Sequence, residues 1–419
     1  MTKNGIFYNI RLFYGKEGII MHLIRRNRIL AVVVLSLTVF TGCGTGNSYD
    51  DYATNENYLD DKSNNKDDKK SDNSSQKGIS KEDVKVGVLY ISDPNEGSGY
   101  SYTHDLGIIG MQENLGLSDK QIERKIVDDG DKKATGKAIK ECIDDGCNVI
   151  FTTSWGYMET TAAMAEKYPE VYFSHGTGYM SNGKNFNNYF GRIYQARYLS
   201  GIAAGMNTKS DKIGYVAAMG ADNSEVTGGI DAFAIGVESV NPDATVYVKV
   251  TNSWYDPKAE EKASKELLDM GCDVMSQHCD TPYPVSLAQE YGVYAIGYNS
   301  DMSKECPDSC LCSVIWNWSA YYTSAVSSII NGKWTGENYY GGMPEGVVEL
   351  TDVASFAAPG TQDKISKARE SILDGSFNVF DGVLKTNTGK KIGEKSKTLE
   401  DSVITGGINW YYHNVKVLE

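Results

Sequence analysis

Positive charge is scarce in this sequence. Its 41 lysine and arginine residues are outnumbered by 55 aspartate and glutamate residues, so the formal net charge is −14. A nucleic-acid-binding surface needs an excess of basic side chains to neutralise phosphates, so the composition argues against a nucleic-acid partner and favours a small molecule or a protein. With 419 residues, 41% of them hydrophobic, the chain is long enough for about two or three domains.

Long apolar runs are also missing. The run nearest the N-terminus, residues 29–40, is shorter than a bilayer span of about 20 residues, so we expect a cleaved signal and not a permanent membrane helix. Arginines precede this run, and Phe40-Thr41-Gly42-Cys43 follows it. Small residues before a cysteine resemble a bacterial lipoprotein box, which implies a signal peptide over residues 1–42 and lipid attachment to Cys43. The alternatives are an ordinary signal peptide with an incidental cysteine and, for the start of the chain, Met21.

Large apolar residues are rare between residues 43 and 83, where asparagine, aspartate, serine and lysine dominate. Such a composition buries too little surface to fold, so it predicts a solvated tether. Together with a lipid on Cys43, this tether would hold the folded body at the outer face of a bacterial cell membrane.

Motifs for catalysis are absent as well. The sequence has no Gly-x-Ser-x-Gly elbow and no Gly-x-x-x-x-Gly-Lys phosphate loop. Of only five histidines, His104, His175 and His278 stand alone near predicted strand ends, an arrangement more typical of hydrogen-bonding spacers than of metal ligands. We therefore expect no catalytic residue, no metal and no cofactor.

The cysteines after Cys43 are odd in number, so they cannot all pair within one chain. The closely spaced group near residue 310 leaves one disulfide, reduced thiols or a zinc site open as alternatives. The pairing also stays open for the full set, which is Cys142, Cys147, Cys272, Cys279, Cys306, Cys310 and Cys312.

The body of the chain contains an internal repeat. Residues 133–149 (Lys-Ala-x-x-Lys-Ala-x-Lys-Glu-x-x-Asp-x-Gly-Cys-x-Val) match residues 258–274 at every named position, an offset of about 125 residues. A repeat of this length indicates two similar domains. Each domain alternates predicted strands and helices, which predicts a parallel, doubly wound sheet.

The fold class expected from this pattern is α/β, with two Rossmann-like doubly wound lobes and a hinge, as in type I periplasmic binding proteins. Lobe one comprises residues 84–193 plus about 297–335, and lobe two residues 194–296 plus about 336–419. Strands are expected at residues 84–92, 123–128, 148–153 and 171–175 of lobe one, and at 212–219, 244–250, 273–277 and 294–298 of lobe two. Residues 313–318 predict a further strand that leads into a helix ending near residue 330, and residues 347–358 contain more strand.

Candidate binding residues follow the predicted strand ends. The strand at residues 148–153 leads into Trp155-Gly156-Tyr157-Met158, and other aromatic or polar turns lie at residues 97–104, 252–255 and 277–280. Ligands collect beyond the carboxyl ends of parallel strands. We therefore expect these turns to hold a flat, mostly uncharged molecule between aromatic rings.

Five motifs resemble those of the basic membrane lipoproteins of the PnrA-like group, which are substrate-binding proteins of ABC importers for purine nucleosides and related compounds. The likeness spans about residues 84–334. The motifs are residues 99–105 (Gly-Tyr-Ser-Tyr-Thr-His-Asp), 151–158 (Phe-Thr-Thr-Ser-Trp-Gly-Tyr-Met), 198–205 (Tyr-Leu-x-Gly-x-x-Ala-Gly), 241–244 (Asn-Pro-Asp-Ala) and 296–302 (Ile-Gly-Tyr-Asn-Ser-Asp-Met).

The resemblance implies a receptor whose two lobes close on a purine, and it implies roles for ten residues. Aromatic side chains would stack on the ring faces, and amide or carboxyl groups would contact the ring edges. The stacking residues are Trp155 with Tyr102 or Trp254, the edge residues are Asn299, Asp280 and Gln277, and Gly156, Tyr157, Asp301 and Trp318 complete the expected ligand-binding set.

Two positions depart from the nucleoside-binding pattern of that family. There an aspartate occupies the position of Asn299 and grips ribose, and a lysine lies downstream, where this chain has Trp316-Asn317-Trp318. A neutral amide cannot make the charge-assisted bonds of a carboxylate, which are roughly twice as strong as neutral ones. We therefore expect a free purine base such as adenine or hypoxanthine in preference to a nucleoside.

The function that the resemblance implies is that of an extracytoplasmic, lipid-anchored solute-binding protein of an ABC importer. Its partners would be the purine and the permease and ATPase subunits. Two alternatives remain open at this stage: the same receptor body feeding a signalling partner, and a nucleoside hydrolase.

Overall fold

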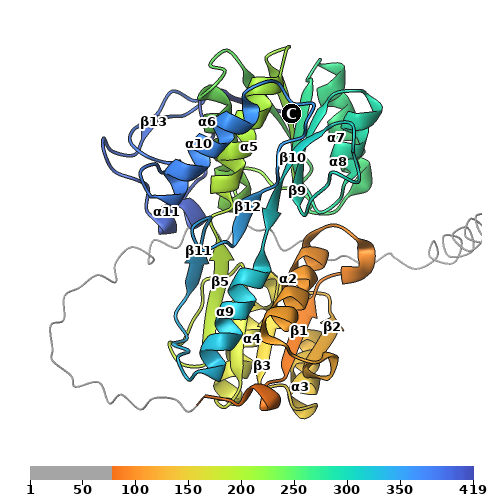
Figure 1. The fold of residues 1–419 in the computed structure, drawn as a ribbon, viewed down its shortest axis with the longest axis vertical. Helices are drawn as coiled ribbons and strands as arrows, with labels where there is room; N and C mark the ends of the chain where they lie inside the picture. Colours follow the sequence, from red (N-terminus) through yellow and green to blue (C-terminus); the bar gives the residue numbers. More distant parts are fainter. Residues whose placement is uncertain (1–77) are drawn as a thin grey trace, which may run out of the picture. The chain divides into compact units, whose positions relative to one another are not determined.

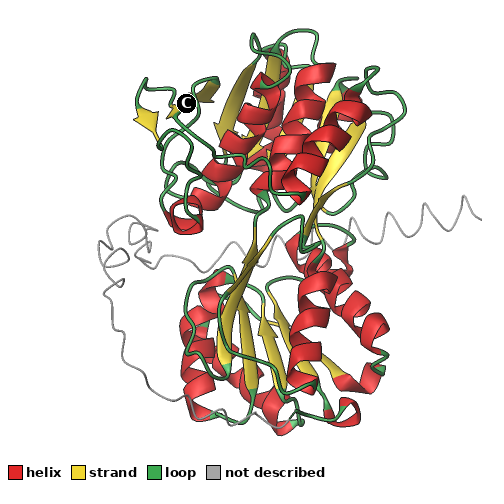
Figure 2. Cartoon of the chain, turned by 60° about the vertical axis from the view of Figure 1, so that its left-hand side comes forward, coloured by secondary structure: helices red, strands yellow, loops and turns green. Residues whose placement is uncertain are grey.

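A computed structural model describes residues 78–419. The expected signal peptide, the alternative start at Met21, Cys43 and most of the tether lie outside the described residues. The described body contains two large β-sheets with helices on both faces, each the sheet of one lobe (Figure 1, Figure 2). The predicted α/β class, with two parallel, doubly wound lobes, is confirmed.

Lobe one is built on a six-stranded, all-parallel sheet in the order β11-β5-β4-β3-β1-β2. The helices that flank it pack in pairs, α2 with α9 and α3 with α4. The strands are β1 (Val86–Tyr90), β2 (Ile122–Ile126), β3 (Val149–Thr152), β4 (Tyr172–Gly176), β5 (Phe186–Gly191) and β11 (Tyr339–Gly341), and the helices are α2 (Tyr100–Leu115), α3 (Lys132–Asp144), α4 (Met158–Lys167) and α9 (Trp318–Ile330).

The apolar run of β1 explains why this sheet has helices on both faces. Val86, Val88 and Tyr90 belong to one core with residues of α2 and α9, whereas Leu89 belongs to another core with residues of α3 and α4. Successive strand residues point to opposite faces of a sheet, so an unbroken run of apolar residues stays buried only if both faces are covered.

Lobe two is built on a seven-stranded sheet in the order β12-β10-β9-β8-β6-β7-β15, in which only β12 is antiparallel to its neighbour. Helices α7 and α8 share a core on one face, and α5 and α6 share the core on the other. The strands are β6 (Lys212–Ala217), β7 (Thr245–Val250), β8 (Val274–His278), β9 (Tyr294–Asn299), β10 (Cys310–Trp316), β12 (Val348–Leu350) and β15 (Val415–Leu418), and the helices are α5 (Tyr194–Asn207), α6 (Ser224–Glu238), α7 (Pro257–Asp269), α8 (Tyr283–Glu290), α10 (Thr361–Leu373) and α11 (Asp401–Gly406).

The internal repeat folds into the same unit in each lobe. Helices α3 and α7 each have 13 residues, and each begins after an aspartate whose side chain accepts hydrogen bonds from backbone N–H groups of the first turn. Each ends near a glycine at positive φ, Gly146 at 93° and Gly271 at 86°, and leads into a buried strand. An acidic N-cap and a left-handed glycine are the local signals that start and stop a helix, so matched sequence produces matched structure.

The first crossing between the lobes lies where the sequence predicted it, but the second and third come later than predicted. It leaves lobe one after β5, returns after β10 and leaves again after β11. Residues 297–316, expected in lobe one, form the end of β9 and all of β10 in lobe two, and β11, expected in lobe two, pairs with β5. Hydrophobic patterning shows that a segment is a strand but not which sheet it joins, because pairing is decided by contacts distant in sequence.

Strands β5, β11 and β15 were not predicted. Strand β5 has the sequence Phe-Asn-Asn-Tyr-Phe-Gly, and its two asparagines interrupt the run of apolar residues expected of a buried strand. Asn187 is nevertheless buried, because its side-chain amide donates to the Tyr321 hydroxyl (3.1 Å) and to the Glu337 carbonyl (3.0 Å). The hydrophobic periodicity of a sequence does not predict the burial of a polar side chain whose hydrogen-bond partners lie far along the chain.

The first crossing is held by Arg192, which follows β5. Its guanidinium makes a two-point contact with the Asp401 carboxylate (3.2 and 2.6 Å) and donates to the Tyr340 carbonyl (2.5 Å). One side chain thus joins the chain after β5, strand β11 and helix α11. Among residues 78–419, none of the helices is long and apolar enough to span a membrane.

Candidate functional site

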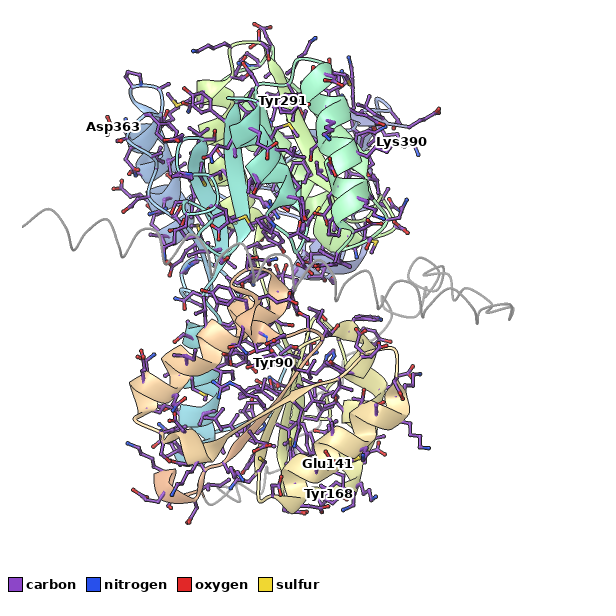
Figure 3. The ribbon with its side chains drawn as sticks, turned by 90° about the vertical axis from the view of Figure 1, so that its right-hand side faces the viewer. Tyr90, Glu141, Tyr168, Tyr291, Asp363 and Lys390 are labelled. Atoms are coloured by element: carbon purple, nitrogen blue, oxygen red, sulfur yellow. The ribbon has the colours of Figure 1, made fainter. Side chains whose placement is uncertain are left out.

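The carboxyl ends of the lobe-one strands carry a group of aromatic and imidazole side chains. Tyr90, which ends β1, lies at the opposite end of the sheet from Glu141 and Tyr168 (Figure 3). At this end the Tyr100 hydroxyl donates to the Thr153 carbonyl just after β3, and its ring meets the ring of His104 edge-on at 4.5 Å. The first turn of α2 and the end of β3 are thereby held together.

The corresponding ends of the lobe-two strands carry acids and amides. His278 ends β8, Asp280 follows it, and Asn299 ends β9. The Asn299 side chain donates from Nδ2 to the Asp280 carboxyl (2.8 Å). Asn299 has a φ of 69°, a left-handed conformation that asparagine tolerates better than most residues, so its side chain is aimed by an unusual backbone turn.

The two strand-end groups meet at Gly99. A Cβ atom on Gly99 would lie 2.5 Å from the Asp280 carbonyl oxygen, so the start of α2 in lobe one touches the β8–α8 turn of lobe two. Gly99 also has a φ of 86°, which favours glycine for a second reason. We call the residues gathered around this contact the lobe junction: Tyr100, His104, Glu225, His278, Asp280 and Asn299.

A stack of three rings lies beside the lobe junction, where the chain crosses from β10 to α9. Trp318 is stacked on Trp316 at 4.5 Å and on His104 at 4.7 Å, with interplanar angles of 11° and 9°. Both faces of the Trp318 indole are therefore covered, which leaves only its edge for a ligand. Its Nε1 is buried without a protein partner.

Four of the expected ligand residues are held by protein partners. The buried Tyr157 hydroxyl donates to the Val127 carbonyl (2.5 Å), and a Cβ on Gly156 would lie 2.4 Å from the Asp129 carbonyl. The Gln277 amide donates to the Thr281 carbonyl (3.1 Å) and accepts from the Cys279 N–H (2.9 Å). The exposed Asp301 accepts from the Ser303 N–H (2.9 Å). Their part in ligand binding stays a prediction, and strand-end position alone did not indicate these protein contacts.

The remaining expected residues surround the lobe junction. Trp155 follows β3, is half-buried, and has its ring 5.7 Å from that of Tyr179. Trp254 is half-buried with its ring edge-on to His278 at 5.8 Å, and its carbonyl accepts from the Asp280 N–H (2.8 Å). Tyr102, also half-buried, lies in the first turn of α2.

Burial keeps the ionisable groups of the lobe junction close to neutral. Desolvation lowers the pKa of His104 to about 3, and burial together with the Arg197 charge lowers the pKa of His278 well below its usual value. Desolvation also raises the pKa of Glu225 to about 8 and that of Asp280 to about 7. At neutral pH the imidazoles are therefore uncharged, and protonated carboxyl groups are substantially populated.

Several buried polar atoms at and beside the lobe junction have no protein partner. They are His104 Nε2, His278 Nε2, Asn299 Oδ1, Trp318 Nε1, and Nε and Nη2 of Arg197. Leaving a buried donor or acceptor unpaired costs about 1–3 kcal/mol, so a concentration of such atoms at strand ends indicates a ligand or ordered water.

Arg197 and Glu225 were missed by the sequence analysis. Arg197 lies in α5, fully buried, with its guanidinium 4.0 Å from the Tyr298 ring and Nη1 donating to the Gln277 carbonyl (2.7 Å). Glu225 lies in the first turn of α6, the helix that follows β6. The strand-end rule that selected Trp155 also points to the turn after β6, so it could have found Glu225.

Other parts of the described chain offer weaker support for a binding site. A hollow of about 400 Å³ is lined by residues near the C-terminus, including Lys390 (Figure 3) and Trp410, and none of its lining residues has a buried polar atom without a partner. Within residues 78–419, no group of three or more histidine, cysteine, aspartate or glutamate side chains is placed to hold a metal ion.

Comparison with known proteins agrees with this geometry. A family model described as "ABC transporter substrate-binding protein PnrA-like" matches residues 84–381. A purine-binding protein of Brucella abortus is 35% identical over 80% of this chain and 93% of its own length, and a putative ABC transporter glucose-binding protein of Haloferax volcanii is 34% identical over 72% and 75%. Among solved structures, an ABC transporter solute-binding protein from Conexibacter woesei superposes with a TM-score of 0.59 at 18% identity, covering 70% of this chain and 98% of that one.

Proposed function

The chain belongs to the PnrA-like family of ABC transporter substrate-binding proteins, and from this premise we propose that it binds a purine, as the free base in preference to the nucleoside, at the lobe junction. Substrate-binding proteins of this class work outside the cytoplasm and hand a solute to a transporter. We further propose that Cys43 carries a lipid, that the partners are an ABC permease and its ATPase, and that the transport is import.

One observation carries the choice of ligand: the lobe junction, with the ring stack beside it, combines aromatic rings with unpaired polar atoms on uncharged groups. Unpaired donors include Trp318 Nε1, and the unpaired Asn299 Oδ1 is an acceptor. A purine base is flat and uncharged, and it presents donors and acceptors around its rim. Stacking supplies roughly 0.5–1.5 kcal/mol beyond area burial, and hydrogen bonds fix the orientation of the ring.

Preference for the free base rests on Asn299. The side chain at this position is a neutral amide; one N–H of its Nδ2 donates to Asp280, and its Oδ1 has no protein partner and can face a ligand. One amide oxygen cannot grip two ribose hydroxyls as a carboxylate does. A base that fills the space between both lobes would favour the closed arrangement, because both lobes contact it only there.

A thermal-shift panel tests the proposal. The purified protein is incubated with adenine, hypoxanthine, adenosine, inosine, a pyrimidine, glucose and an amino acid. We expect adenine or hypoxanthine to raise the unfolding temperature most, because a ligand at about 100 times its Kd stabilises the folded state by about 2.7 kcal/mol. Nucleosides should give smaller shifts at equal concentration.

Two results would contradict the proposal. A largest shift with glucose would assign this chain the ligand class named for the Haloferax volcanii relative. No shift with any purine, while another compound in the panel stabilises the protein, would remove the purine altogether.

A further inference from the structure

Glu225 has unused hydrogen-bonding capacity inside the lobe junction. The side chain of Glu225 is 23% exposed. The protein around it is nevertheless close enough for desolvation to be the largest cause of its raised pKa. His278 Nε2 lies 3.9 Å from Glu225 Oε1, beyond hydrogen-bond distance. The other ring nitrogen of His278 is paired with the Tyr215 hydroxyl (3.1 Å), so the imidazole is held in place and its free Nε2 remains beside Glu225.

Groups from six other elements and one turn face Glu225. Arg197 comes from α5, Tyr215 from β6, His278 from β8, Tyr298 from β9, Tyr340 from β11 and Tyr100 from α2, with Asp280 on the turn after β8. Arg197 is the only one of these that carries a positive charge at neutral pH. Within residues 78–419, Arg197 forms no ion pair. Its Nη1 donates to the Gln277 carbonyl, and the face of its guanidinium lies over the Tyr298 ring.

From this geometry, and resting on the proposed purine binding, we infer that Glu225 contacts the edge of the purine as a neutral carboxylic acid. Its O–H donates to a ring nitrogen or carbonyl oxygen of the base, and its C=O accepts the adjacent N–H. Glu225 is then a specificity-determining residue that selects an uncharged edge with an acceptor beside a donor.

The chemistry of the base supports this pairing. Adenine and hypoxanthine both present an acceptor next to an N–H, and a carboxylic acid has the complementary donor and acceptor on one planar group. A carboxylate has only acceptors, so it would face the acceptor of the base with another acceptor and leave it unpaired. An edge with two adjacent N–H donors would instead favour the carboxylate, which separates the two ligand classes.

The environment keeps the acid neutral. Desolvation and the nearby Asp280 raise the pKa of Glu225 to about 8, and the opposing influence of Arg197 is smaller. The same burial raises the pKa of Asp280 to about 7, although the Asn299 hydrogen bond lowers it. Two carboxyl groups in one desolvated space ionise less readily than either alone.

Glu225→Gln is the decisive variant, because an amide also donates and accepts but does not titrate. Adenine affinity is measured by calorimetry from about pH 6 to about pH 9 for the wild type, Glu225→Gln and Glu225→Ala. At about pH 6 we expect Gln to match the wild type within about threefold and Ala to lose about tenfold or more. Above pH 8 the ratio of wild-type to Gln affinity should fall by up to about tenfold per pH unit, as the acid ionises. Ionisation of the ligand affects both proteins equally and cancels in the ratio.

The pH dependence of stability, measured without ligand, provides a second test of the state of Glu225. Because burial raises the pKa of folded Glu225 from 4.5 to about 8, the folded protein holds more protons than the unfolded chain between those values. Its stability therefore falls as the pH rises through that interval. The unfolding temperature of the wild type should decline relative to that of Glu225→Gln between about pH 5 and about pH 8.

Failure of the Glu225 inference can be distinguished from failure of the proposed purine binding. If the wild type binds adenine with the same affinity at every pH and Gln binds as weakly as Ala at about pH 6, Glu225 acts as a carboxylate and this inference is overturned while purine binding stands. If no purine binds the wild type at any pH, the proposed function itself is overturned, and this inference with it.

Discussion

Replacing Gly201 by alanine is expected to destabilise lobe two by about 3 kcal/mol or more, at the upper end of the range for overpacked cores. Gly201 lies in α5, and a Cβ there would sit 2.0 Å from the Phe233 carbonyl oxygen of α6. Gly236 of α6 makes the reciprocal contact, with its Cβ 2.0 Å from the Tyr198 carbonyl. The two helix backbones touch, so a methyl group must push the helices apart. Chemical denaturation of the purified variant measures the loss.

Gly136→Ala is the matched control. Gly136 is also inside a helix, α3, but the nearest atom to an added Cβ is Thr160 Cγ2 at an ordinary 3.5 Å. Alanine there should stabilise the protein by up to about 1 kcal/mol, because glycine is the poorer helix former. Equal destabilisation by both substitutions would mean that backbone contact between α5 and α6 does not explain the effect at Gly201.

Replacing Trp155 by alanine is expected to weaken binding of the purine by about 5- to 150-fold, since stacking of one base on an aromatic side chain is worth about 1–3 kcal/mol. Trp155 begins the turn after β3, at the carboxyl end of the lobe-one strands, and its ring is half-buried. Calorimetry with adenine measures the change, with the unfolding temperature as a check that the variant is folded.

Trp410→Ala tests the competing location. Trp410 is also half-buried, but it lines the hollow near the C-terminus and not the lobe junction. We expect its substitution to leave adenine affinity within about twofold of the wild type, which is about 0.4 kcal/mol. Loss of affinity with Trp410→Ala and not with Trp155→Ala would move the binding site to that hollow.

Arg192 and Asp401 show how the far C-terminal segment bears on the hinge. The family model ends at residue 381, whereas Asp401 and β15 lie beyond it. Strand β15 nevertheless extends the lobe-two sheet beside β7, and Asp401 holds Arg192 at the first crossing. The segment outside the family match is thus integrated into lobe two and attached to the chain where the lobes join.

The sequence predicted most elements because their signals are local. The strand at residues 148–153 is an apolar run that ends at a turn, and α3 and α7 have an acidic cap and a terminal glycine. The same locality limits what the sequence shows about side-chain contacts. Tyr157 has the position of a ligand residue, but its hydroxyl reaches the Val127 carbonyl, 30 residues earlier in the chain. No pattern within a few residues of Tyr157 contains that information.

By itself, the sequence determined the class of fold, the duplication and the kind of side chain that follows each strand, since these depend on periodicity and on residues a few positions apart. Only the tertiary structure decided that Glu225 and Asp280 share one desolvated space, that Trp318 is covered on both faces, and that residues 297–316 belong to lobe two. These outcomes depend on contacts between segments far apart in the chain. Burial, and the pKa shifts that follow from it, exist only once such segments have come together.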